Sequence, residues 1–206
     1  MNDIVNYWGF LTACILLNLT PGSDTIYSLT RTIVEGKKAG LMSSFGILTG
    51  FFVHILEVSV GLSQIIAHSP TLFSVLKYAG AAYLCWLGIK MWREPFLVNQ
   101  INLDKLPLWQ IYRQGLLTNL LNPKVILFFL ALLPQFVASN VENTFLPFFL
   151  LGLTSLSTTT VWVIVLVFLA SPFGNLLRNN QQISATMNKI CGVIFILLAV
   201  NIGLVH

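Results

Sequence analysis

Hydrophobic residues dominate long runs of this chain, and short polar segments separate the runs. A run of about 20 apolar residues is long enough to cross a bilayer as an α-helix. The pattern predicts about six such spans, with approximate bounds Trp8–Ile33, Gly40–Ala67, Leu72–Met91, Gln114–Val137, Phe145–Leu169 and Met187–Val205. We therefore predict an all-α integral membrane protein.

Two of these spans are interrupted near their middle by a proline beside a charged residue. The interruptions read Asn18-Leu19-Thr20-Pro21-Gly22-Ser23-Asp24 and Asn119-Leu120-Leu121-Asn122-Pro123-Lys124. A proline frees a backbone carbonyl, and a charge at the bilayer centre costs about 2.5–3.5 kcal/mol on insertion scales. The sequence therefore predicts that helices one and four are broken at proline, with a polar site built from both breaks.

Composition supports the membrane assignment. Of the 206 residues, 56% are hydrophobic and 9% are charged, whereas soluble domains carry about 25% charged residues. The mean hydropathy is +0.81. The net charge of +4 is spread between apolar runs, without a cluster that suits a phosphate backbone, so no nucleic-acid partner is expected. Residues 1–206 are predicted to form a single transmembrane domain.

Basic residues predict the orientation of the spans. Lysines and arginines flank the first, third and fifth joins between spans, but the other two joins carry none. By the positive-inside rule the basic joins face the cytoplasm, which places both termini on the outer side of the membrane. Half-repeats of about residues 1–92 and 110–206, joined by a cytoplasmic linker of about 93–109, would then be two inverted three-helix repeats.

The first break carries the strongest candidate site. A half-helix that starts near Gly22 presents free N–H groups and a positive dipole end, which suit a substrate carboxylate. Asp24 lies near the bilayer midplane and adds an acceptor for an ammonium group or a proton. The alternative is that Ser23 and Asp24 only cap the helix after Pro21.

The second break supplies the opposite charge. Asn122 can hydrogen-bond the backbone that Pro123 frees. Lys124 can pair with Asp24, bind a substrate carboxylate, or form a purely structural ion pair that holds the two breaks together.

Three titratable residues lie on neighbouring spans. His54 and Glu57 are one helical turn apart, so they share a face and can relay protons, or they can be packed hydrogen-bonding residues. Lys77, near the outer end of the third span, can face the transport path or snorkel to the lipid headgroups.

Small and hydroxyl-bearing residues predict helix contacts. Gly46 and Gly50 form a G-x-x-x-G pattern, which indicates close helix packing or a homodimer, and the hydroxyl cluster at residues 157–160 is typical of contacts between helices.

Other classes of chemistry have little support. Cys14, Cys85 and Cys191 are isolated, without a C-x-x-C pair, and the three histidines are scattered. No nucleotide-binding or hydrolase motif is present. We expect no metal, no cofactor and no enzymatic activity. The alternative retained is a membrane transporter of a metal ion or of redox equivalents on a related fold.

With these residues in view, the chain resembles the lysine exporter superfamily, in particular its homoserine/threonine-exporter branch. The resemblance rests on the motif at residues 19–25, on the block at residues 76–88 and on the block at residues 115–124, and it extends to length and span count. One departure is Ser23, which replaces the second proline of the family's P-G-P-D motif.

The resemblance implies a proton-driven exporter of neutral amino acids, such as threonine, homoserine or leucine, or of related small amines. It also implies that Asp24, Lys77, Asn122, Pro123 and Lys124 belong to the transport path. We therefore predict a secondary transporter in which Asp24 binds the substrate ammonium and releases it when protonated.

Overall fold

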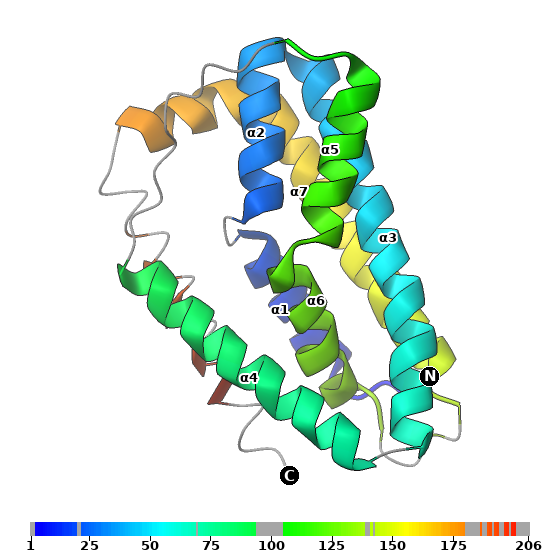
Figure 1. Ribbon diagram of the computed structural model, residues 1–206. Helices are drawn as coiled ribbons and strands as arrows, with labels where there is room; N and C mark the ends of the chain where they lie inside the picture. The colour runs from blue at the N-terminus through cyan, green and yellow to red at the C-terminus, as the bar shows by residue number, and fades with distance from the viewer. Residues whose placement is uncertain are drawn as a thin grey trace.

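A computed structural model gives the architecture, which is all-helical in the described part of the chain (Figure 1). It describes residues 3–19, 22–68, 70–93, 105–138, 141, 143–179, 186, 189–190, 192–193, 196–197 and 199–200. The helices are α1 (Tyr7–Leu19), α2 (Ser23–Glu35), α3 (Lys37–His68), α4 (Pro70–Arg93), α5 (Leu108–Leu120), α6 (Pro123–Leu132), the short 3₁₀-helix η1 (Leu133–Phe136) and α7 (Phe145–Asn179). Helix α3 packs against α2, α4, α5, α6 and α7.

A one-residue turn joins α2 to α3. Gly36 adopts φ +88°, a conformation that glycine tolerates best, and its N–H donates to the carbonyl of Thr32 at 3.0 Å. A Cβ at Gly40 would lie only 2.0 Å from Oγ1 of Thr32. The missing side chain therefore lets α2 and α3 form a tight hairpin, which the hydroxyl contact of Ser28 with Ser44 (2.9 Å) extends.

Glycines on two helices bring α3 and α5 into backbone contact. A Cβ at Gly46 would lie 2.1 Å from the carbonyl oxygen of Tyr112, and one at Gly115 would lie 2.4 Å from that of Ser43. Gly50, also on α3, faces Asn119 on α5. The predicted close packing of the G-x-x-x-G pattern is therefore made within the chain.

Helix α5 is followed by a break and then by α6. The two helices are bent by 45° relative to one another. Asn122 is the N-cap of α6, and its side-chain Oδ1 accepts the N–H of Lys124 at 3.1 Å. Pro123 occupies the first turn, where its missing N–H costs nothing. In the other half of the chain α1 ends at Leu19 and α2 begins at Ser23, while Thr20 and Pro21 lie outside the described residues.

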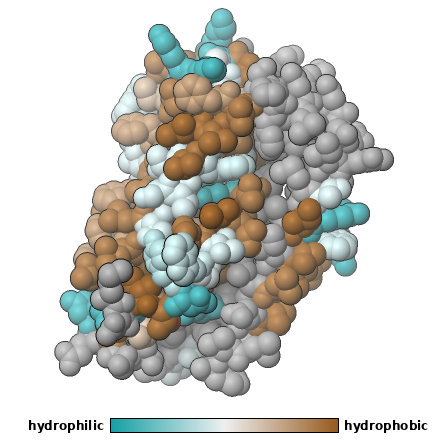
Figure 2. Space-filling model, turned by 180° about the vertical axis from the view of Figure 1, so that it is seen from behind, coloured by the Kyte–Doolittle hydropathy of each residue, from teal (hydrophilic) through white to brown (hydrophobic). Residues whose placement is uncertain are grey.

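Aromatic residues form the core between α1, α3, α6 and α7. Phe128 and Phe129 on α6 are fully buried and pack against Phe10 and Phe51 with ring centroids 6.4 and 5.0 Å apart. Outward-facing residues are apolar as well, and much of the surface in Figure 2 is hydrophobic. Phe45 on α3 and Val161 on α7, for example, are 61% and 63% exposed. A helix that is apolar all round suits a lipid environment.

The membrane-spanning helices follow from length and apolarity. Within the described residues, the stretches Lys37–Gly61 and Phe145–Ala170 are each long enough to cross a bilayer, and the bent pair α5–α6 makes a third candidate. Helix α1 is apolar but shorter. These helices support a multi-pass membrane protein. The predicted six-span count and inverted repeat extend over residues that are not described, and they remain predictions.

Several exposed basic residues lie at one end of the bundle. At one end, called here the basic end, α2 finishes and α3 and α5 begin, at the top of Figure 1. The exposed basic residues there are Lys37, Lys38, Lys105 and Arg113. At the opposite end the chain before α1 pairs with the segment after η1, since Val5 N–H donates to the Phe136 carbonyl and Ala138 N–H donates to the Asp3 carbonyl, both at 2.9 Å.

Candidate functional site at the helix breaks

The two helix breaks meet at Asp24 and Asn119. Asp24 lies in the first turn of α2, and Asn119 is fully buried in the last turn of α5. The side-chain Nδ2 of Asn119 donates to Oδ2 of Asp24 at 2.8 Å. A carboxylate near a helix N-terminus interacts favourably with the helix dipole. Residues far apart in the sequence therefore form one polar centre.

Lys124 connects the same centre to α1. Its Nζ donates to the carbonyl of Leu17 at 3.0 Å, in the last turn of α1. A cation is stabilised there by the negative end of the dipole. Its side chain also runs past Gly22, where an added Cβ would lie 3.4 Å from Nζ. The Lys124 ammonium acts electrostatically on the Asp24 carboxylate. Opposite charges from the two breaks thus share one region.

Helix α2 begins without a side-chain cap. Its N-cap is Gly22, in an extended conformation (φ −130°, ψ −178°), and no side chain among the described residues caps the helix there. The prediction had left open that Ser23 and Asp24 serve only as caps. Instead Ser23 is exposed as the first helical residue, and the Asp24 carboxylate is engaged by Asn119.

Three buried polar atoms of this centre lack a hydrogen-bond partner among the described residues. They are Oδ1 of Asp24, Oδ1 of Asn119 and Nδ2 of Asn122. Asn122 is 4% exposed and lies close to Asp24. Buried polar groups without partners cost about 1–3 kcal/mol each, so such atoms are uncommon outside functional sites. Together they offer two acceptors and one donor to a polar ligand.

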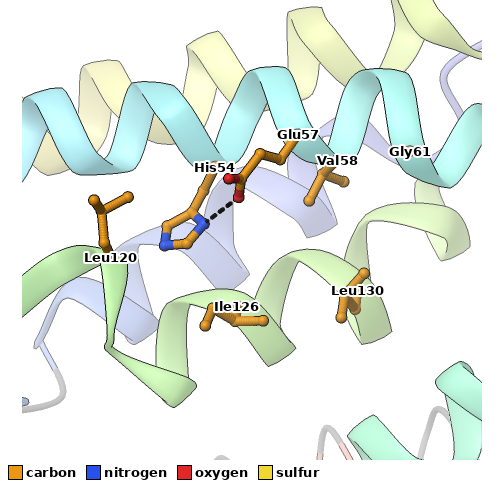
Figure 3. A pocket seen from close by; sticks show the side chains of 7 residues that line it. All are labelled: His54, Glu57, Val58, Gly61, Leu120, Ile126 and Leu130. Atoms are coloured by element: carbon orange, nitrogen blue, oxygen red, sulfur yellow. Dashed lines mark hydrogen bonds and ion pairs between the residues drawn. The ribbon is translucent and has the colours of Figure 1, made fainter.

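His54 and Glu57 extend the centre towards a pocket (Figure 3). Nδ1 of His54 lies 3.1 Å from Oε2 of Glu57, and Nε2 lies 3.3 Å from the carbonyl of Asn119. The side chain of His54 is 6% exposed, whereas that of Glu57 is 62% exposed. His54 therefore links an accessible carboxylate to the residue that holds Asp24.

The pocket lies between α3 and the second break. Its volume is about 420 Å³, within the usual range of ligand sites. The lining residues are His54, Glu57, Val58, Gly61, Leu120, Ile126 and Leu130. The apolar members can hold an aliphatic group, and the two titratable residues lie at one side of the space (Figure 3).

The hydroxyl cluster on α7 holds α1. Oγ1 of Thr158 accepts from Nδ2 of Asn18 at 3.2 Å, and Oγ1 of Thr159 donates to Oδ1 of Asn18 at 3.0 Å. Ser157 and Thr160 bond to carbonyls of their own helix. The expectation of contacts between helices is therefore met by two members of the cluster.

Not every predicted site residue can be placed. Pro21 lies outside the described residues, and so does the side chain of Lys77 on α4. Gly22, Ser23, Asp24, Asn122, Pro123 and Lys124 lie at the breaks, and His54 and Glu57 lie beside them. Sequence reasoning did not single out Asn119. The signal was present, because two asparagines precede Pro123 within an otherwise apolar stretch.

The described residues give no support to the metal or redox alternative. They contain no group of three or more His, Cys, Asp or Glu side chains that could hold a metal ion. Cys14 is a buried free thiol, and Cys85 is also free. Cys191 lies outside the described residues.

Residues 15–205 match the LysE type translocator family. This chain belongs to that family. It is 34% identical over 196 residues to the homoserine/homoserine lactone efflux protein of Salmonella typhimurium, covering 93% of each chain. It is 33% identical to the homoserine/homoserine lactone efflux protein of Salmonella typhi, again covering 93% of each chain. It is 32% identical to an uncharacterized membrane protein of Vibrio cholerae, covering 94% of each chain. No solved structure matches the chain.

Family membership sets the class of activity. As a LysE type translocator with relatives named for efflux, the chain is a membrane protein of amino-acid efflux. The family match spans both breaks, so the polar centre at Asp24 belongs to the translocator itself.

Proposed function

We propose that this translocator exports neutral amino acids, of the threonine, homoserine or leucine kind, or related small amines, in exchange for protons. The supporting observation is the set of three buried atoms without partners at the breaks. Oδ1 of Asp24 and Oδ1 of Asn119 can accept from a substrate ammonium. Nδ2 of Asn122 can donate to a carboxylate or to an ester carbonyl.

This pattern fits both substrates in the names of the two Salmonella relatives. Homoserine and its lactone share an ammonium beside a carbonyl carbon, but only homoserine carries a carboxylate. Lys124 and the uncapped start of α2 favour negative charge. The site therefore suits a zwitterion, while the neutral donor Asn122 also suits a lactone.

Protons reach the centre from the pocket in this proposal. Glu57 is accessible and His54 is buried between Glu57 and Asn119. A histidine changes charge near neutral pH and can pass protons between neighbouring groups. Protonation of Asp24 from this side would remove the negative charge that holds the ammonium, so the substrate leaves as the proton binds.

The membrane setting completes the proposal. The protein lies in a bacterial inner membrane with the basic end in the cytoplasm and both termini outside. Two inverted three-helix halves rock against one another around the breaks, which gives each side access in turn.

Reconstituted vesicles test this function. Purified protein in proteoliposomes should release labelled homoserine or threonine when a proton gradient is imposed, and efflux should carry protons the other way. The variant Asp24→Asn keeps the shape of the side chain but cannot take up a proton, so we expect it to lose gradient-driven efflux. Efflux at the full rate with the same pH dependence would refute the role of Asp24.

Asp3→Asn is the matched control, because Asp3 is exposed and lies before α1. It should transport like the parent protein. Glu57→Gln should retain substrate binding but change the dependence of efflux on external pH, and an unchanged profile would remove Glu57 from the proton path.

A further inference from the structure

A second polar network joins α2 to α5 between the breaks and the basic end. The guanidinium of Arg31 donates to Oε1 of Glu35 and, at 3.1 Å, to Oε1 of Gln114. The hydroxyl of Tyr27 donates to the Ile111 carbonyl and interacts with Oε1 of Gln114, both at 3.0 Å. The Arg31 guanidinium also lies 5.6 Å from the centre of the Tyr27 ring. The network therefore has several strong contacts across one helix pair.

Charge burial distinguishes this network from a surface ion pair. The side chains of Arg31 and Glu35 are 4% and 8% exposed. The second carboxylate oxygen of Glu35 accepts the backbone N–H of Leu106 at 3.0 Å, just before α5. The ion pair itself lies within α2 and fixes the positions of the two charged groups. Opening would break the bonds that cross to α5, from Arg31 to Gln114 and from the Leu106 N–H to Glu35, and a bond to a charged group is costly to lose.

Asp24 and this network lie on the same face of α2. Asp24, Tyr27 and Arg31 follow helical spacing, and all three contact α5, at Asn119, Gln114 and Ile111. The helices run antiparallel, so Arg31 lies about 10 Å from Asp24 along α2, on the side of the basic end. The pocket at His54 lies on the other side of the breaks (Figures 1 and 3).

We propose that Tyr27, Arg31, Glu35 and Gln114 form a gate, which must open by separation of α2 from α5 before a molecule can reach Asp24 from the basic end. The observed arrangement is then the state closed at the basic end, with the pocket as the space on the far side. This inference rests on the proposed transport function, and it assigns transport roles to residues outside the substrate site.

Cross-linking across the gate gives the main test. The double variant Tyr27→Cys/Gln114→Cys is made in a background in which Cys14, Cys85 and Cys191 are replaced by alanine. A short bifunctional methanethiosulfonate then joins the two introduced thiols. We expect efflux from proteoliposomes to fall to the rate of protein-free vesicles and to return with reductant. Gln114 is exposed, so the reagent can reach it. Efflux that is equal before and after cross-linking would overturn the gate.

A disulfide within one half is the matched control. Ser28 and Ser44 are buried, and their hydroxyl oxygens lie 2.9 Å apart between α2 and α3. The pair Ser28→Cys and Ser44→Cys, closed with an oxidant, should leave efflux active, because α2 and α3 move together. Loss of efflux in both locked proteins would mean that any restraint on α2 stops transport, and the assignment of the gate to the α2–α5 contact would fail.

A labelling experiment tests the gate without any transported substrate. Thr118 lies one turn beyond Gln114 on α5, towards the break, so a Thr118→Cys reporter reads opening of the α2–α5 contact. Gln114→Leu removes two contacts and should speed labelling by an impermeant maleimide, added from the basic end, by about tenfold. Gln114→Glu strengthens the contact with Arg31 and should slow labelling.

The two experiments separate the failure of the gate from the failure of the function. Faster labelling in Gln114→Leu together with slower labelling in Gln114→Glu supports the gate even if the parent protein exports no amino acid. Equal labelling rates, or shifts in the same direction, contradict the gate even if amino-acid export is found.

Discussion

The side-chain amide of Asn119 donates a 2.8 Å hydrogen bond to the Asp24 carboxylate, so the end of α5 holds the start of α2. Both residues lie beside helix breaks that are about a hundred positions apart in the sequence. Asn119 also meets His54 through its backbone carbonyl. One residue therefore touches the proposed substrate group and the proposed proton path.

Loss of the Asn119 amide should weaken transport. Asn119→Leu keeps the backbone carbonyl that faces His54 but removes the bond to Asp24. A hydrogen bond to a charged group contributes about 1.5–3 kcal/mol, so we expect efflux efficiency to fall by about tenfold or more. The measurement is the initial rate of labelled homoserine efflux over a range of concentrations.

The control for Asn119 is Thr160→Val on α7, because the Thr160 hydroxyl donates to the Leu156 carbonyl of its own helix. That variant should retain the parent rate. Equal rates for Asn119→Leu and the parent protein would show that Asp24 works without this partner.

Asp24 and Lys124 should be coupled in stability. Removal of one charge deprives the other, which is partly buried, of its opposite charge, so Asp24→Asn and Lys124→Met should each destabilise the protein. The double variant should be less destabilised than the sum of the single variants, by about 0.5–3 kcal/mol. Thermal unfolding of the four proteins in one detergent measures this coupling, and additive effects would mean that the two charges act independently.

Glu35 gives a pH dependence with a defined sign. Burial opposes its ionisation, but the N–H of Leu106, the guanidinium of Arg31 and the charge of Lys105 together lower the Glu35 pKa below its usual 4.5. A lowered folded-state pKa stabilises the protein above pH 4.5, and that contribution is lost as the pH falls through the folded-state pKa.

The test of Glu35 compares melting temperatures of the parent protein and Glu35→Gln. We expect the parent to be the more stable at pH 7, and the difference to shrink as the pH falls below 4.5. A difference that stays constant over that range would show that the ionised carboxylate contributes nothing.

Glycine substitutions test the contact between α3 and α5. A Cβ at Gly46 would clash with the Tyr112 carbonyl at 2.1 Å, and overpacking typically costs about 1–3 kcal/mol. Gly46→Ala should therefore lower the melting temperature by several degrees, at about 2–4 °C per kcal/mol for a chain of this size.

Gly61→Ala, on the same helix, is the matched comparison. A Cβ there meets no atom of the described residues within 4 Å, so alanine should be neutral or stabilising by up to about 1 kcal/mol. A melting temperature for Gly46→Ala at or above that of Gly61→Ala would contradict the close packing.

Local sequence was sufficient to find the polar centre but not its contacts. Asp24 and Lys124 were recognised because charges are rare in apolar runs and because each follows a proline. Their partners depend on how α2, α5 and α1 cross, which is a tertiary property that no spacing encodes. Asn119 and the Leu17 carbonyl were therefore not predicted as partners of the two charges.

The gate illustrates the same limit. From the sequence alone, Arg31 at the end of the first predicted span indicates only which side of the membrane is cytoplasmic. The structure buries it between Glu35 and Gln114. Arg31 and Glu35 are four positions apart and so share one face of α2, but only the packing of α5 shows that this face is covered. The glycine pattern predicted a tertiary contact better than the charges did, since the close packing expected from Gly46 and Gly50 occurs between α3 and α5.

The single residue between α2 and α3 has a mechanical consequence. A joint as short as Gly36, reinforced by the bond from its N–H to Thr32, leaves α2 little freedom to tilt without α3. The length of α3 from this joint to His54 is about 27 Å. A small tilt of α2 and α3 together would therefore displace His54 and the pocket sideways by more than it displaces residues near Gly36.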